Sequence, residues 1–108
     1  MTSDRFGELI ATRWLGLDGE RAIQIVLDAP RVEPSGDASV RVQMFGLGPD
    51  HDHVRTVWGV DAFQALELTF RMIGIILETC GEGREGRLSW EGASAPGDLG
   101  FPKLPAVE

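Results

Sequence analysis

The one cluster of metal-ligand residue types in this sequence is the tetrapeptide Asp50-His51-Asp52-His53. In an extended segment, side chains two residues apart lie on the same face, so His51 and His53 could chelate a divalent cation such as zinc or nickel. A catalytic zinc needs about three protein ligands and a structural zinc needs four. The chain has only 2 histidines, so carboxylates would have to complete the site. The alternative, which we favour, is a solvated loop in which Asp and Pro make the turn.

No other arrangement of residue types indicates a catalytic centre. The sequence contains no Gly-x-Ser-x-Gly stretch of the kind that presents a nucleophilic serine. Gly46-x-Gly48 lacks the third glycine of a dinucleotide fingerprint, and the glycines from Gly81 to Gly86 follow a predicted helix instead of preceding it. We therefore predict no catalytic residues and no cofactor, and the sequence leans away from an enzyme.

Three tryptophans, Trp14, Trp58 and Trp90, lie on three different predicted strands. Ligand pockets are largely aromatic, so these residues could line a site for a small apolar molecule. More often such side chains fill the space between a sheet and a helix, with each indole N–H bonded to a carbonyl. We favour this core interpretation.

Alternating apolar and polar residues predict four strands before one long helix and a fifth strand after it. The predicted strands cover residues 9–15, 21–28, 39–45, 54–58 and 87–91. The Asp18-Gly19 pair joins the first two in a hairpin, and Pro30 and Pro34 mark the loop that follows. We predict one α+β domain over residues 1–108, an antiparallel sheet of about four to five strands packed on one long helix in the order β-β-β-β-α-β. Residues 1–7 would be a loose leader and residues 92–108 an irregular tail.

The predicted helix spans residues 61–80. Asp61 is placed as its N-cap with Gln64 three residues on, which is capping-box spacing, and Gly81 is placed to end it in the left-handed conformation. Glu67 and Arg71 are spaced to pair, and the Thr69 hydroxyl can bond back to the preceding turn.

Nearly the whole circumference of this helix is apolar. At about 100° per residue, its polar residues fall in one arc about 80° wide. These residues are Gln64, Glu67, Arg71, Gly74 and Glu78. A helix on an open surface needs an apolar stripe of only about 100° or somewhat more, so something besides one sheet face must cover this helix.

The excess apolar surface predicts an interaction. The candidate contact residues are Leu68, Met72, Ile75 and Ile76, and the partner would be another protein or a second copy in a homodimer. Alternatively, the C-terminal tail with Leu99, Phe101 and Leu104 could lie along the helix and cover part of the apolar arc.

Composition narrows the class of partner. A net charge of −7 and a pI near 4.7 argue against nucleic acid, which needs clustered Lys and Arg. The predicted helix carries charges within its apolar stretch and is no membrane span. Cys80 is the only cysteine, and we expect its side chain to be a small buried apolar group. A single cysteine cannot form a disulfide within the chain, which favours a reducing, cytoplasmic compartment. Nine of the basic residues are arginine, a bias typical of a bacterial genome rich in G and C.

Two segments together resemble a family of small bacterial proteins known only as a domain of unknown function. One is the helix start, Gly59-Val60-Asp61-Ala62-Phe63-Gln64-Ala65-Leu66, and the other is Gly97-Asp98-Leu99-Gly100-Phe101-Pro102. The resemblance covers roughly residues 9–102 and implies a small α+β cytosolic domain. The family often has Ser where this chain has Ala62. The resemblance assigns no catalytic residue.

The sequence thus favours a non-enzymatic protein-interaction module. One alternative is a metal-binding protein or enzyme built on His51 and His53. Another is an acidic immunity-type inhibitor of a basic toxin, for which charge and size are the only motives. A third is a small-ligand carrier that uses the tryptophans.

Overall fold

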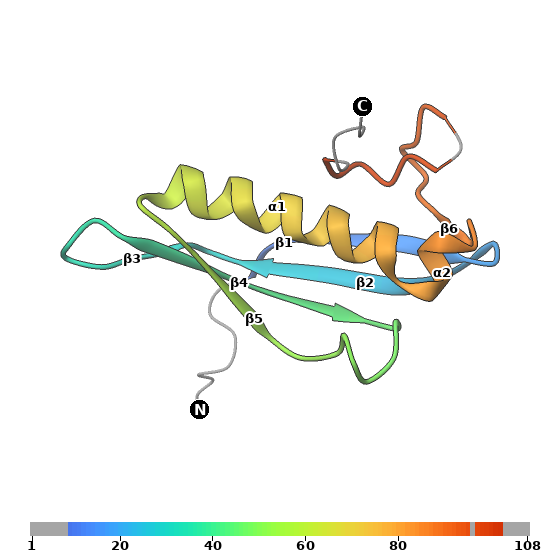
Figure 1. Cartoon of the computed structure of the whole chain (residues 1–108), viewed down its shortest axis with the longest axis horizontal. Coiled ribbons are helices and arrows are strands. Elements are labelled where there is room, and N and C mark those ends of the chain that lie inside the picture. The colour runs from blue at the N-terminus through green and yellow to red at the C-terminus, as the bar shows by residue number, and fades with distance from the viewer. Residues whose placement is uncertain (1–8, 96, 103–108) are drawn as a thin grey trace.

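The computed structural model describes residues 9–95 and 97–102 of the chain. Its elements in chain order are β1 (Leu9–Leu17), β2 (Glu20–Asp28), β3 (Arg31–Val32), β4 (Ala38–Phe45), β5 (Arg55–Gly59), α1 (Ala62–Thr79), α2 (Gly81–Arg84) and β6 (Leu88–Ser89). The long helix lies across one face of an antiparallel sheet (Figure 1). This arrangement confirms the predicted α+β class, with β3 and α2 as elements that the sequence pattern did not reveal.

The strand register fixes which strands form the edges of the sheet. Ala38 pairs with both Val32 and Gly59, and Val42 pairs with both Leu27 and Arg55. Because a strand has only two edges, β2 and β3 lie along one edge of β4 and β5 lies along the other. The sheet therefore runs β5-β4-β2-β1-β6, and β5 is its outermost strand on the side of β4.

The β1–β2 hairpin turns at Asp18 and Gly19, both with positive φ (54° and 88°), as the sequence predicted. The Asp18 carboxylate also accepts hydrogen bonds from the Arg87 guanidinium, the shortest at 2.7 Å. This hydrogen bonding lowers the pKa of Asp18, although partial desolvation opposes the shift. The hairpin tip is thus tied to the segment that follows α2.

A one-residue bulge between β2 and β3 is filled by a buried ion pair. Leu27 pairs with Val42 but Arg31 pairs with Ser39, so the β2–β3 side holds one extra residue. Within this interruption the Asp28 carboxylate accepts the backbone N–H of Arg41 at 3.0 Å and its Nε–H at 2.9 Å. The Asp28 side chain is only 1% exposed. A side-chain acceptor therefore occupies this interruption of the ladder. The chain that follows is a loop as predicted, except that Arg31–Val32 forms β3.

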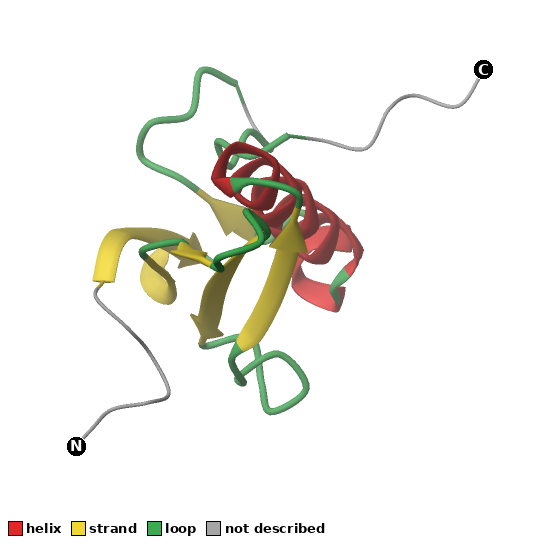
Figure 2. Cartoon of the chain, turned by 90° about the vertical axis from the view of Figure 1, so that its left-hand side faces the viewer, coloured by secondary structure: helices red, strands yellow, loops and turns green. Residues whose placement is uncertain are grey.

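The core lies between the sheet and one row of helix residues. Ile23, Ile25, Val40 and Val42 point inward from the central strands, and all four are buried. The facing row on α1 has four-residue spacing and consists of Ala65, Thr69, Ile73 and Leu77. The Thr69 hydroxyl donates to the Ala65 carbonyl at 2.7 Å, as predicted, so its burial leaves no unpaired donor. Figure 2 shows both helices on the same side of the strands.

The helix begins as predicted and ends differently. The Asp61 carboxylate accepts the Gln64 N–H at 2.8 Å, and the Gln64 amide oxygen accepts the Val60 N–H at 2.8 Å. At the other end Gly81 does not adopt the left-handed conformation that we expected. Instead Cys80 turns the chain in an extended conformation and its sulfur accepts the Gly83 N–H, which starts α2. As predicted, Cys80 is buried.

Two of the three tryptophans lie outside the core, contrary to our expectation, whereas Trp90 is half-buried against it. Trp14 and Trp58 are 40% and 54% exposed. Their cross-strand partners are Gln24 and Ser39, which lie on the face of the sheet that turns away from the helix. A strand alternation pattern identifies two faces, but the strand length and register decide which of them meets the helix.

Removing the Asp28 carboxylate tests how far the bulge depends on its ion pair. We expect Asp28→Ala to lower the free energy of unfolding by about 3–5 kcal/mol, because it leaves the Arg41 charge buried without this partner. The exposed Glu67–Arg71 pair, which forms at 3.2 Å, is the control, and Glu67→Gln should cost less than about 1 kcal/mol. Urea unfolding of both variants measures the difference, and equal losses would contradict this account.

Candidate functional site

The two sides of α1 have different surroundings. On one side, Phe70 and Ile73 line a hollow together with Arg13 of β1 and Ile25 of β2. At about 100° per residue, Leu68, Met72, Ile75 and Ile76 lie on the opposite side of the helix, and α1 packs against β4 and β5. We call these four residues the open flank. They are the candidate contact residues that the sequence predicted.

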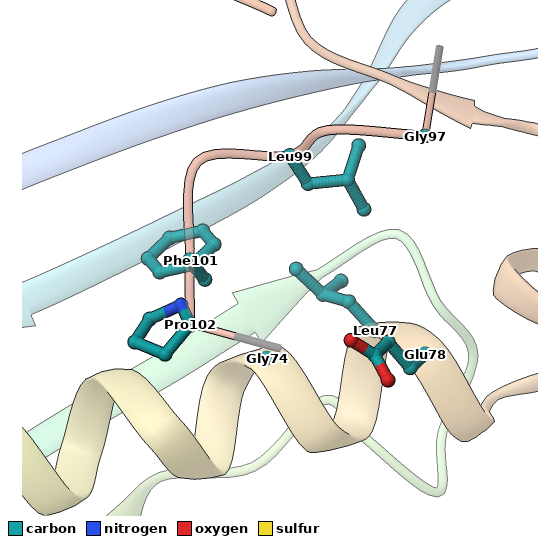
Figure 3. Close-up of a pocket in the computed structure, with 7 residues that line it drawn as sticks. All are labelled: Gly74, Leu77, Glu78, Gly97, Leu99, Phe101 and Pro102. Carbon is teal, nitrogen blue, oxygen red and sulfur yellow. The ribbon is translucent and has the colours of Figure 1, made fainter. Parts of the chain in front are cut away.

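The side of α1 nearer β1 is covered by the segment from Gly97 to Pro102. Leu99 and Leu77 point toward each other there, and Phe101 and Pro102 lie over Gly74 (Figure 3). A Cβ atom on Gly74 would collide with the Pro102 carbonyl oxygen. Gly74 was predicted to belong to the polar arc, but it is buried because this segment rests on its backbone.

The tail therefore covers one part of the apolar arc. The part of the prediction that named Leu99 and Phe101 agrees with this packing, because both are half-buried against the core. Leu104 lies outside the described residues. The chain itself thus covers part of the apolar helix surface that the sheet leaves exposed.

Arg13 holds this covering segment in place. Its guanidinium donates to the carbonyls of Leu99 and Gly100, each at 3.2 Å. It also lies 4.0 Å from the centre of the Trp90 ring and 4.8 Å from that of Phe101, where cation–π attraction adds to the hydrogen bonds. Burial lowers the pKa of Arg13, and the charge of Asp98 partly opposes the shift. The alternation of residues along β1 did not indicate that Arg13 would hold the tail segment.

The open flank is not covered by any described segment in the same way. Leu68 and Ile75 are 37% and 41% exposed, while Met72 and Ile76 are half-buried against the core. The flank contains no charged residue. Among the described strands, β5 pairs only with β4, so the outer edge of β5 is unpaired beside this flank. An apolar stripe and a free strand edge therefore adjoin.

The residues proposed as metal ligands lie in the loop before β5. The backbone turns there, with the His51 N–H bonded to the Gly48 carbonyl at 3.1 Å, so the segment is not extended as we had assumed. His51 is half-buried and its Nδ1 has no hydrogen-bond partner in the described structure, whereas His53 is exposed. Within residues 9–95 and 97–102, no three His, Cys, Asp or Glu side chains are grouped to hold a metal. A metal role for His51 and His53 stays a prediction.

The hollow beside β1 has about 500 Å³ of open space. Its lining is apolar apart from Thr12 and Arg13, and the Arg13 guanidinium is engaged by the tail. This lining suits an apolar group and provides no general acid or base.

A family described as "Domain of unknown function (DUF6968)" matches residues 11–103. No curated protein and no solved structure matches the chain. In the described part of the chain, no helix is long and apolar enough to cross a membrane.

Substituting Gly74 tests the packing of the tail on the helix. Alanine favours a helix over glycine by about 1 kcal/mol, but here its methyl group would push Pro102 off α1 and expose Phe101. We expect Gly74→Ala to lower the free energy of unfolding by about 1–3 kcal/mol. Gly81→Ala is the matched control, because a Cβ there meets open space, and it should stabilise by up to about 1 kcal/mol. A stabilised Gly74→Ala protein would contradict the contact.

A thermal melt in zinc tests the histidine loop. A site filled at a hundred times its Kd would add about 2.7 kcal/mol of stability and raise Tm by several degrees. We expect no such rise, because the described residues supply no third ligand beside His51 and His53. A rise in Tm that disappears in the His51→Ala, His53→Ala double variant would establish the metal site instead.

Proposed function

We propose that this chain, which belongs to the DUF6968 family, acts as a protein-interaction module whose contact surface is the open flank of α1 together with the free edge of β5. The observation that carries the proposal is that exposed apolar side chains, Leu68 and Ile75, lie on the side of α1 toward β5, a strand whose outer edge has no partner among the described residues.

Each half of this surface provides a different part of a protein contact. Burying the exposed parts of Leu68, Met72 and Ile75 gains about 25 cal/mol for each Å² removed from water. The N–H and C=O groups on the edge of β5 can accept an added strand, which fixes the direction and register of a partner. A surface of this kind binds an apolar stripe and a strand at the same time.

The charge distribution supports an apolar contact over an electrostatic one. The chain has a net charge of −7, but the open flank is neutral and the neighbouring Glu67 is paired with Arg71. A strongly basic partner, such as the toxin of an immunity-type pair, would therefore be attracted to acidic surface outside the open flank. A single buried cysteine suits a reducing compartment, and we propose a cytoplasmic location on this basis.

The proposal is tested by capture from a lysate of the source cells that contains wild-type chains carrying two different tags. We expect the bait to retain a protein, either the differently tagged chain or another one, and the Leu68→Glu, Ile75→Glu double variant to retain at least about tenfold less, since it places charges in the contact. The Glu67→Gln, Arg71→Gln double variant is the control on the polar side of the same helix and should retain the wild-type amount.

Mass spectrometry identifies the retained proteins, and circular dichroism shows that both variants are folded. The interaction is then repeated with purified components to obtain its Kd. If wild-type bait retains no protein, or if the double glutamate variant retains the same proteins as the wild type, the open flank is not the contact surface.

A further inference from the structure

We propose that the hollow between β1 and α1 binds a small amphipathic carboxylic acid, whose apolar body enters the hollow and whose carboxylate pairs with Arg13. The hollow lies on the side of α1 opposite the open flank, so this inference goes beyond the proposed protein contact and does not depend on it. Three features of the described structure carry it: the unfilled space between sheet and helix, the apolar walls of that space, and the cation that lines it.

The space exists because β1 has a small side chain where it faces the helix. Across the hairpin, Ala11 pairs with Leu27. Arg13 pairs with Ile25, and both partners are buried in the core. Directly opposed residues of an antiparallel pair point to the same face, so Ala11 and Arg13 lie on the side of the sheet that faces α1. Leu15, the next residue of this row, is 1% exposed, whereas Ala11 is exposed. The methyl group of Ala11 leaves open a space of about 500 Å³, which includes its mouth to solvent.

The walls of the hollow are apolar and come from three parts of the chain. Five of the side chains belong to β2, α1 and the segment from Gly97 to Pro102: Ile25, Leu27, Phe70, Ile73 and Phe101. Ile73 is 1% exposed, whereas Phe70 is 37% exposed and can gain contacts from a bound molecule. Sites for small molecules are typically concave and lined by apolar and aromatic side chains around a few polar groups. The hollow has this composition.

Arg13 is the only charged residue in the described lining. A guanidinium has five N–H donors, and the hydrogen bonds from Arg13 to the carbonyls of Leu99 and Gly100 both start at Nη1. The N–H groups on Nε and Nη2 have no hydrogen-bond partner among the described residues. These two nitrogens form the edge of a guanidinium that a carboxylate can bind with two parallel hydrogen bonds. Arg13 can therefore hold the tail segment and a ligand at the same time.

Charge favours an anionic ligand over a cationic one at this place. Burial lowers the pKa of Arg13, which means that its charge has lost part of its hydration, and a carboxylate beside it would compensate for that loss. Asp98 also acts on Arg13, but its carboxylate accepts the backbone N–H groups of Ser94 and Gly100 and is not part of the lining. Because the chain as a whole carries −7, an anion is repelled by most of the surface and needs a site that contains a cation.

Octanoate is the probe for this site, and 1-octanol and octylamine are its controls with the same apolar body. NMR titration of the full chain, followed at the methyl groups of Ile25 and Ile73, measures binding in the hollow. We expect octanoate to shift these signals saturably with a Kd of about 1 mM or lower, which is typical of a ligand with so few atoms. The neutral and the cationic control should bind at least about tenfold more weakly.

Two variants test the two halves of the site. Ala11→Leu should fill the hollow and weaken octanoate binding at least about tenfold, whereas Ala22→Leu, an equal change at an exposed β2 position outside the lining, should leave it unchanged. Arg13→Gln should weaken octanoate at least about tenfold without changing the affinity for 1-octanol. A purely structural role of Arg13 would instead affect both molecules alike. Circular dichroism checks that each variant is folded.

The outcomes separate this inference from the proposed function. Equal affinity for octanoate and octylamine, or unchanged octanoate binding in Ala11→Leu, overturns the proposed site. An absence of binding to the wild type also overturns it, and binding that then appears in Leu104→Ser would show that the chain's own residues occupy the hollow. None of these results bears on the open flank, because the capture experiment changes residues on the other side of α1.

Discussion

The structure depends on one constraint, which is that α1 is apolar around most of its circumference while a sheet can cover only one side of a helix. The row through Thr69 and Ile73 meets the sheet. The side nearer β1 is covered by the segment that ends at Pro102, and this segment needs both a glycine at position 74 and an arginine at position 13 to be seated. The remaining side lies toward the edge of the sheet, and it is the surface that we propose as the protein contact.

A second constraint is the buried Asp28–Arg41 ion pair, which lies at the bulge in the sheet. The Asp28–Arg41 pair occupies a break in the ladder between β2 and β4, and its carboxylate is almost fully buried. Beyond the break β3 continues along the same edge of β4, so the other edge stays available to β5. Burial of such a pair is not by itself a gain in stability, but it specifies where the bulge occurs and so which residues face the helix on each side of it.

The elements that rest on local chemistry were predictable from the sequence. The Asp18-Gly19 turn, the Asp61 and Gln64 cap and the back-bonded Thr69 each involve residues within a few positions of one another. The features that escaped prediction involve distant residues. Arg13 reads as an outward strand residue until the tail brings two carbonyls and two rings to it, and Gly74 reads as polar surface until Pro102 rests on it. The candidate contact residues could be named from the sequence, because the helical period alone shows that the helix has more apolar surface than a sheet can cover. The outer edge of β5, unpaired among the described strands, could be identified only from the strand order.

The contact between Arg13 and the tail has a consequence for how the chain acquires its structure. It joins residues 86 and 87 positions apart, so its loop-closure entropy is far less favourable than that of the β1–β2 hairpin. Contacts of such long range form late, after the hairpins and the helix have docked. Until then the side of α1 nearer β1 is uncovered as well as the open flank. The apolar surface of this helix is therefore greatest before the tail docks, and docking of the tail reduces the surface through which partly folded chains could aggregate.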